Sequence, residues 1–92
     1  MKPIDPWKEL DLMLRRLEYL PPGASMRHVI EEIGRVDDMG VPRFMIVDAL
    51  RSTPYKCSPT TLSSYLYRRA RARKLMLSRL TFRLLAEDSV AN

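Results

Sequence analysis

The chain has 92 residues, enough for one small domain with a single modest core. Its composition is that of a globular protein, 46% hydrophobic and 29% charged, and no apolar run approaches the ~20 residues that span a bilayer. A single cysteine, Cys57, excludes an intrachain disulfide, and His28 is the only histidine, which excludes a Cys/His zinc site. We therefore expect one domain over residues 1–92 with no metal or other cofactor. The prolines and the acid near the N-terminus do not fit a secretory signal, so we expect a cytoplasmic location.

Charge is divided unevenly along the chain. Residues 1–50 hold seven basic and nine acidic side chains, a net charge of −2, whereas residues 51–92 hold nine basic and two acidic ones, a net charge of +7. Between Arg51 and Arg83 there is no acidic residue at all. A block of like charge repels itself, and its natural partner is a polyanion such as nucleic acid.

The first two expected helices are marked by their ends. Asp5 followed by a proline is a typical helix start, and a pair of prolines ends the hydrogen-bond ladder, which predicts a helix over residues 5–20. Ser25 is the next capping residue, and Gly40 suits the left-handed conformation that often follows a helix. These two residues predict a second helix over residues 25–39.

The third element is shorter. Pro42 begins an apolar run that predicts a helix over residues 42–52. Residues 44–47 could also form a strand, but the sequence offers no partner strand. We therefore predict an all-α fold, a small bundle of four to five helices.

A fourth, basic helix takes up most of the remaining chain. Ser58 and the proline after it repeat the start seen at Asp5, and no further proline or glycine follows, which predicts a helix over residues 58–87. A domain of this size does not need so long a helix, so it either breaks near residues 72–74 or projects beyond the core. Arg73 would lie on the apolar stripe of a continuous helix, which favours a bend.

The two sides of this helix differ in character. At ~100° per residue, one side carries an apolar stripe that we expect to be buried: Leu62, Leu66, Ala70, Leu77, Leu80 and Leu84. The other side carries short hydroxyl residues, which allow close approach to DNA, and arginines, which can hold a guanine with two hydrogen bonds. With the residues before the helix and the flanking cations that suit phosphates, the predicted DNA-binding set is Lys56, Ser58, Thr60, Thr61, Ser64, Arg68, Arg69, Arg71, Arg73 and Lys74.

A short helix, a connector and a long basic helix over residues 42–74 resemble a helix-turn-helix unit, whose second helix enters the major groove by its N-terminal part. The opening Ser-Pro-Thr-Thr-Leu-Ser-Ser-Tyr-Leu of residues 58–66 is similar to recognition helices of small regulators found on plasmids, phages and other mobile elements. The resemblance covers about a third of the chain. It departs from the tightest form of the motif, because the connector over residues 53–57 is long and lacks glycine. It implies sequence-specific binding of double-stranded DNA by a small transcriptional or mobile-element regulator.

Other function classes were weighed against DNA binding. An enzyme is not expected, because no second histidine completes a pair with Cys57 and the three glycines are isolated rather than gathered in a phosphate loop. Cys57 is instead expected to be a packed structural residue. A phage-type inhibitor or adaptor, whose basic face engages or mimics a nucleic-acid partner, is the alternative. RNA binding is a further alternative, since Tyr65 and Tyr67 stand among arginines and could stack unpaired bases.

The C-terminal stretch over residues 75–85 is apolar on more than one side. Leu75 and Phe82 are seven residues apart and lie away from the apolar stripe, so they predict a contact with a second copy. The alternative is that this stretch folds back on Trp7 and Leu14. A symmetric homodimer would supply two recognition helices for two DNA half-sites.

Overall fold

The computed structural model describes residues 3–91, with side chains described through residue 86. It is all-helical over this range, with four helices: α1 (Pro6–Glu18), α2 (Met26–Asp38), α3 (Arg43–Leu50) and α4 (Pro59–Ala91). The strand considered for residues 44–47 is therefore wrong, because these residues belong to α3. The all-α prediction is confirmed, and the predicted helix ends lie within a few residues of the observed ones.

Two of the helix starts follow the capping chemistry expected from the sequence. A carboxylate oxygen of Asp5 accepts hydrogen bonds from the backbone N–H groups of Trp7 (3.0 Å) and Lys8 (3.4 Å). The hydroxyl of Ser58 accepts one from the N–H of Thr61 (3.1 Å) at the start of α4. Each bond satisfies an N–H group that the helix itself leaves unpaired.

All four helices contribute to one core. Its buried apolar side chains are Leu10, Met13, Leu17, Val29, Ile33, Val36, Val41, Ile46, Val47, Leu50, Leu62 and Leu66. After α2, Gly40 takes the left-handed conformation (φ 89°) that lets the chain turn toward α3. Residues 3–69, which contain this core, are called the body below.

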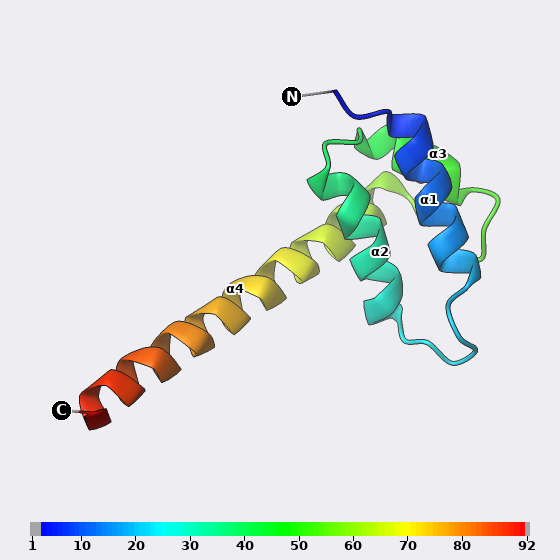
Figure 1. Cartoon of the computed structure of the whole chain (residues 1–92). Helices are drawn as coiled ribbons and strands as arrows, with labels where there is room; N and C mark the ends of the chain where they lie inside the picture. The colour runs from blue at the N-terminus through cyan, green and yellow to red at the C-terminus, as the bar shows by residue number, and fades with distance from the viewer. Residues whose placement is uncertain (1–2, 92) are drawn as a thin grey trace.

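The remainder of α4 leaves the body. Figure 1 shows α4 running away from α1, α2 and α3 as one straight helix. Every described residue from Ala70 to Ala86 is exposed. These residues are called the projecting segment. Of the two arrangements considered for the long helix, projection beyond the core is the observed one.

Two expectations about packing are wrong. The helix does not break near residues 72–74, because Arg73 needs no bend: its guanidinium reaches α2 and pairs with Asp38 (3.3 Å) and Glu31 (3.7 Å). Burial of the apolar stripe ends after Leu66, because α4 leaves the body after Arg69. The later members of the stripe, Ala70, Leu77, Leu80 and Leu84, are exposed.

The first helix has one large aromatic side chain outside the core. Trp7 follows the helical spacing of the α1 core residues, but it is 71% exposed, whereas Leu10, Met13 and Leu17 are buried. The projecting segment also does not fold back on Trp7 and Leu14, since α4 extends away from α1 (Figure 1).

Candidate nucleic-acid interface

The exposed side of the first turns of α4 carries hydroxyl and basic residues. Thr60, Ser64 and Arg68 follow one another at four-residue spacing, which places them one above the other on a helix, and all three are exposed. Arg71 lies one turn further along the same side and is also exposed. This side faces away from Leu62 and Leu66, the two α4 leucines that anchor it in the core. The core contact therefore presents these polar side chains to solvent.

The cations of this surface are free of acidic partners. No ion pair or hydrogen bond to an acid forms, within residues 3–86, at any of six exposed basic side chains on or just before α4: Lys56, Arg68, Arg71, Lys74, Arg79 and Arg83. By contrast, Arg15, Arg35, Arg43 and Arg51 of the body each pair with a nearby carboxylate. The uneven charge of the sequence thus becomes an unneutralised basic surface along α4.

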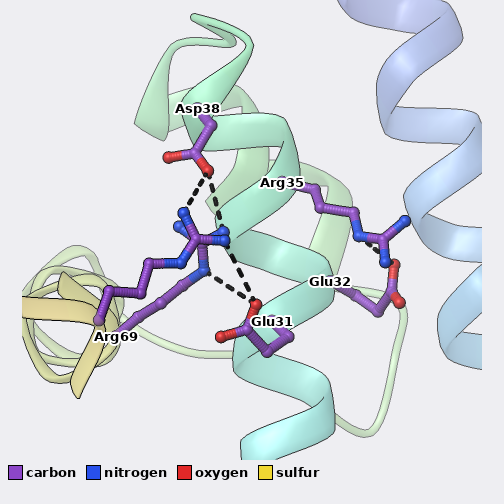
Figure 2. Close-up of polar contacts among 6 residues, drawn as sticks. Glu31, Glu32, Arg35, Asp38 and Arg69 are labelled. Atoms are coloured by element: carbon purple, nitrogen blue, oxygen red, sulfur yellow. Dashed lines mark hydrogen bonds and ion pairs between the residues drawn. The ribbon is translucent and has the colours of Figure 1, made fainter. Parts of the chain in front are cut away.

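Arg69 does not belong to that surface. Its side chain is only 6% exposed and crosses α2, where its Nη2 donates to Asp38 Oδ2 (2.9 Å) and its Nε donates to Glu31 Oε2 (3.3 Å) (Figure 2). Gly34 makes room for it: a Cβ at this position would collide with the Arg69 guanidinium and its neighbouring carbon. The arginine expected to meet phosphates is therefore a buried link between α2 and α4.

The pKa values of Asp38 and Arg69 reflect the contacts between them. The hydrogen bond from Arg69 holds the pKa of Asp38 below its ordinary value, against the opposing effect of burial. Burial lowers the pKa of Arg69, but the hydrogen bonds and charges of Asp38 and Glu31 outweigh burial, so the net shift of this pKa is upward. Arg73 joins the same two acids while remaining half exposed. Both arginines thus carry charges that are already neutralised within the chain.

Other predicted site residues lie at the start of α4. Lys56 and Ser58 are exposed, and Thr61 is partly buried. The hydroxyls of Ser58 and Thr61 lie 3.0 Å apart in a mutual hydrogen bond, so each already has a partner within the helix start. Cys57 packs against the core, and burial raises the pKa of its thiol, which favours the structural role expected for it over reactivity.

The connector before α4 is ordered by one side chain. The hydroxyl of Thr53 donates to the carbonyl of Leu50 (2.7 Å) and accepts from the N–H of Tyr55 (3.1 Å). These bonds hold residues 50–55 in a turn after α3, although this connector is longer than that of a tight helix-turn-helix. Tyr55 packs against the core from this turn.

The residues expected to meet a second copy are accessible. Leu75 is 52% exposed and Phe82 is 75% exposed on the projecting segment, together with other large apolar side chains. A surface helix normally buries one apolar side, whereas this segment carries exposed apolar side chains on more than one side.

Sequence reasoning missed a groove on the body. Trp7 and Phe44, 71% and 74% exposed, flank a hollow of about 530 Å³ between α1 and α3. A second hollow of about 440 Å³ continues it past Leu14 toward Tyr55. Both hollows are called the α1–α3 groove below. No pattern distinguishes these aromatic residues from core residues, because they sit at ordinary helical spacing.

The partners of Arg69 were also missed, although a weak sign of them exists. Glu31 and Asp38 are seven residues apart, so they lie on one side of α2 and offer two carboxylates to one guanidinium. Nothing in the sequence indicates which arginine they bind, since Arg69 lies 31 positions beyond Asp38.

Comparisons with protein-family models, with curated proteins and with solved structures give no match to this chain. Among the described residues, no helix is both long and apolar enough to cross a membrane. The same part of the chain contains no group of three or more His, Cys, Asp or Glu side chains placed to hold a metal ion.

Proposed function

We propose that this protein binds double-stranded DNA with sequence specificity, as a small transcriptional or mobile-element regulator, and that the first turns of α4 are its recognition helix. The observation that carries the proposal is the row of exposed basic side chains along α4 that pair with no acid within residues 3–86, beside the hydroxyl residues of its first turns. In this proposal α3, the connector and α4 act as a helix-turn-helix.

Each residue has a distinct role in the proposed complex. Arg68 reads a base edge, with Thr60 and Ser64 close enough to touch bases or phosphates. Arg71 and Lys74 contact phosphates, and Lys56 does so from the connector. Arg69 is left out of the interface, because withdrawing it would break its contacts with Asp38 and Glu31. Arg73 is secondary for the same reason.

A gel-shift titration in salt tests the electrostatic part of this proposal. We expect Arg71→Ala with Lys74→Ala to weaken binding to random duplex DNA and to flatten the slope of log K against log [salt] by about two units, about one per lost phosphate contact. The matched control is Lys8→Ala with Arg15→Ala, which removes two exposed cations from α1 and should leave the slope unchanged. A parent protein that binds no duplex at low salt contradicts the proposal.

Specificity is tested on a site selected by the protein from a randomised duplex pool. Arg68→Ala should cost about 1–3 kcal/mol on the selected site and less on random duplex. An equal loss on both would make Arg68 a phosphate contact instead. A salt-independent interaction with a protein partner would favour the inhibitor or adaptor alternative.

One observation favours RNA as a second candidate. Tyr67 is 67% exposed and lines a shallow hollow with Arg71 and Lys74, so an unpaired base could stack on its ring between cations. Single-stranded RNA and DNA of matched length in the same titration decide this point. Tyr67→Leu should weaken binding of the single strands if stacking contributes, and should leave duplex binding unchanged.

The proposal also includes self-association through Leu75 and Phe82. Joining copies would add a second recognition helix on the same duplex and raise apparent affinity through effective concentration.

A further inference from the structure

Two surfaces of the molecule expose large apolar side chains to solvent. One is the projecting segment of α4, and the other is the α1–α3 groove beside Trp7 and Phe44. Exposed apolar patches of this kind usually mark a contact with another molecule. The question is whether the two surfaces fit one another.

Their dimensions agree. At 1.5 Å per residue, the α1 wall of the groove from Trp7 to Glu18 extends about 17 Å, and the segment from Leu75 to Ala86 extends about the same distance. The groove opens along α1, between α1 on one side and α3 with the connector on the other, so an apolar helix laid along it would contact both walls. Leu75 and Phe82 lie on one side of the segment and would serve as its anchors.

Their charges are complementary. The groove is lined by three acids, Asp11, Glu18 and Asp48, and by one cation, Arg51. Within residues 3–86, Asp11 and Asp48 pair with exposed arginines on their own helix or just after it, Arg15 (3.2 Å) and Arg51 (3.6 Å), and such exposed pairs contribute little. The segment carries Arg79 and Arg83 without an acid in its described part, so it brings cations to an acidic rim.

Parallel pairing of two projecting segments is disfavoured by the same charges. Each copy carries Lys74, Arg79 and Arg83 there, so a parallel pair places each cation beside the same cation of the other copy. Like charges facing one another across a helix pair are destabilising. The groove offers apolar contact without this repulsion.

A chain cannot fill its own groove. The groove lies between α1 and α3, whereas α4 is continuous and extends away from the opposite side of the body, as Figure 1 shows. The occupant must therefore be the segment of a second copy.

We propose that the projecting segment of one copy docks in the α1–α3 groove of another. The contact joins different surfaces of the two copies, so each copy offers one segment and one groove and the contact can repeat from copy to copy. This inference does not rest on DNA binding, and its test uses no nucleic acid.

Sedimentation velocity over a range of concentrations tests the contact, with the emission of Trp7, the sole tryptophan, as a second readout. The parent should associate beyond the dimer as its concentration rises. Trp7 emission should shift to shorter wavelength in step, because the indole leaves water when the groove is filled. A parent that stays monomeric at tens of micromolar overturns the proposal.

Two variants dissect the contact. Phe44→Glu blocks the groove, and Leu75→Glu with Phe82→Glu blocks the segment; each should raise the concentration needed for association at least tenfold. All three side chains are exposed, so the fold should be retained, as checked by circular dichroism. Tyr19→Glu is the matched control, since Tyr19 directly follows α1, is 83% exposed and lies outside the groove lining, so its change should leave association intact.

Mixing gives the decisive result. The groove variant keeps a working segment and the segment variant keeps a working groove, so an equimolar mixture should form a complex that stops at one copy of each. If the groove variant associates as well as the parent, or if the folded variants do not combine, the groove is not the partner. Should Phe44→Glu fail to fold, Trp7→Glu replaces it, with sedimentation alone as the readout.

Discussion

Leu62 and Leu80 lie on the same side of the same helix, 18 residues or five turns apart, and meet different surroundings. Leu62 is fully buried against the body, whereas Leu80 is 49% exposed on the projecting segment. Around Leu62 the helix has one apolar side and one polar side; around Leu80 its apolar side chains lie on more than one side. The apolar side around Leu62 is buried within the chain, whereas the large apolar side chains around Leu80 remain exposed.

A matched pair of substitutions measures this difference most directly. Leu62→Ala should lower the free energy of unfolding by about 2–5 kcal/mol, because it leaves a cavity in the core. Leu80→Ala should change it by less than about 0.5 kcal/mol in dilute solution, since no body residue covers Leu80. Urea denaturation followed by circular dichroism measures both. Comparable losses would mean that the projecting segment packs on the body.

The ion pairs between α2 and α4, where the body meets the projecting segment, are tested next. Asp38→Asn removes one of the two charge partners of the buried Arg69 guanidinium, the other being Glu31. It should cost about 1–3 kcal/mol, below the value for a fully buried pair because Asp38 is half exposed. Asp48→Asn removes an exposed pair with Arg51 and should cost no more than about 0.5 kcal/mol.

The effect of Asp38 should depend on pH. Because its pKa is lowered in the folded protein, its contribution is fully present above the ordinary pKa of an unfolded aspartate, about 3.9, and is lost as pH falls through the folded value. The stability difference between the parent and Asp38→Asn should thus be constant near neutral pH and shrink below about pH 4. A difference that does not change with pH would mean that Asp38 acts through packing rather than charge.

Two hydroxyl side chains should give the smallest difference in stability between the body and the projecting segment. Ser58→Ala removes the cap at the docked end of α4 and should cost about 1 kcal/mol. The hydroxyl of Thr81 donates to the carbonyl of Leu77 (2.9 Å) within the projecting segment, an interaction that adds little to a helix, so Thr81→Ala should change stability by a few tenths of a kcal/mol at most. Thermal melts of the two variants side by side test this expectation.

The positions of several helix ends could be predicted from the sequence. Asp5, Ser58 and Gly40 set helix ends through their own side chains or backbone freedom, and the structure uses each of them as expected. The polar side of α4 was also predictable, because a helix fixes which residues share a side.

What could not be predicted depends on partners distant in the sequence. Helical spacing shows that Leu77 and Leu80 share a side with Leu62, but not that the body ends before it reaches them. Arg69 and Arg71 look alike in the sequence, and only the approach of Gly34 and Asp38 on α2 makes the first a buried link while the second remains exposed. The DNA-binding role of the exposed residues is still a prediction.

The continuity of α4 across residues 72–74 fixes an angular relation between its two ends. The residues proposed to read DNA and those proposed to join copies are carried by one rigid rod, so their relative direction is set by how many residues separate them. One residue inserted between Arg71 and Leu75 would rotate Phe82 by about 100° relative to Arg68, whereas seven would return it to within about 20° and lengthen the rod by about 10 Å. Only insertions that add close to a whole number of turns would therefore keep the direction of Phe82 relative to Arg68. Each of these insertions would change the spacing between joined copies by a fixed length.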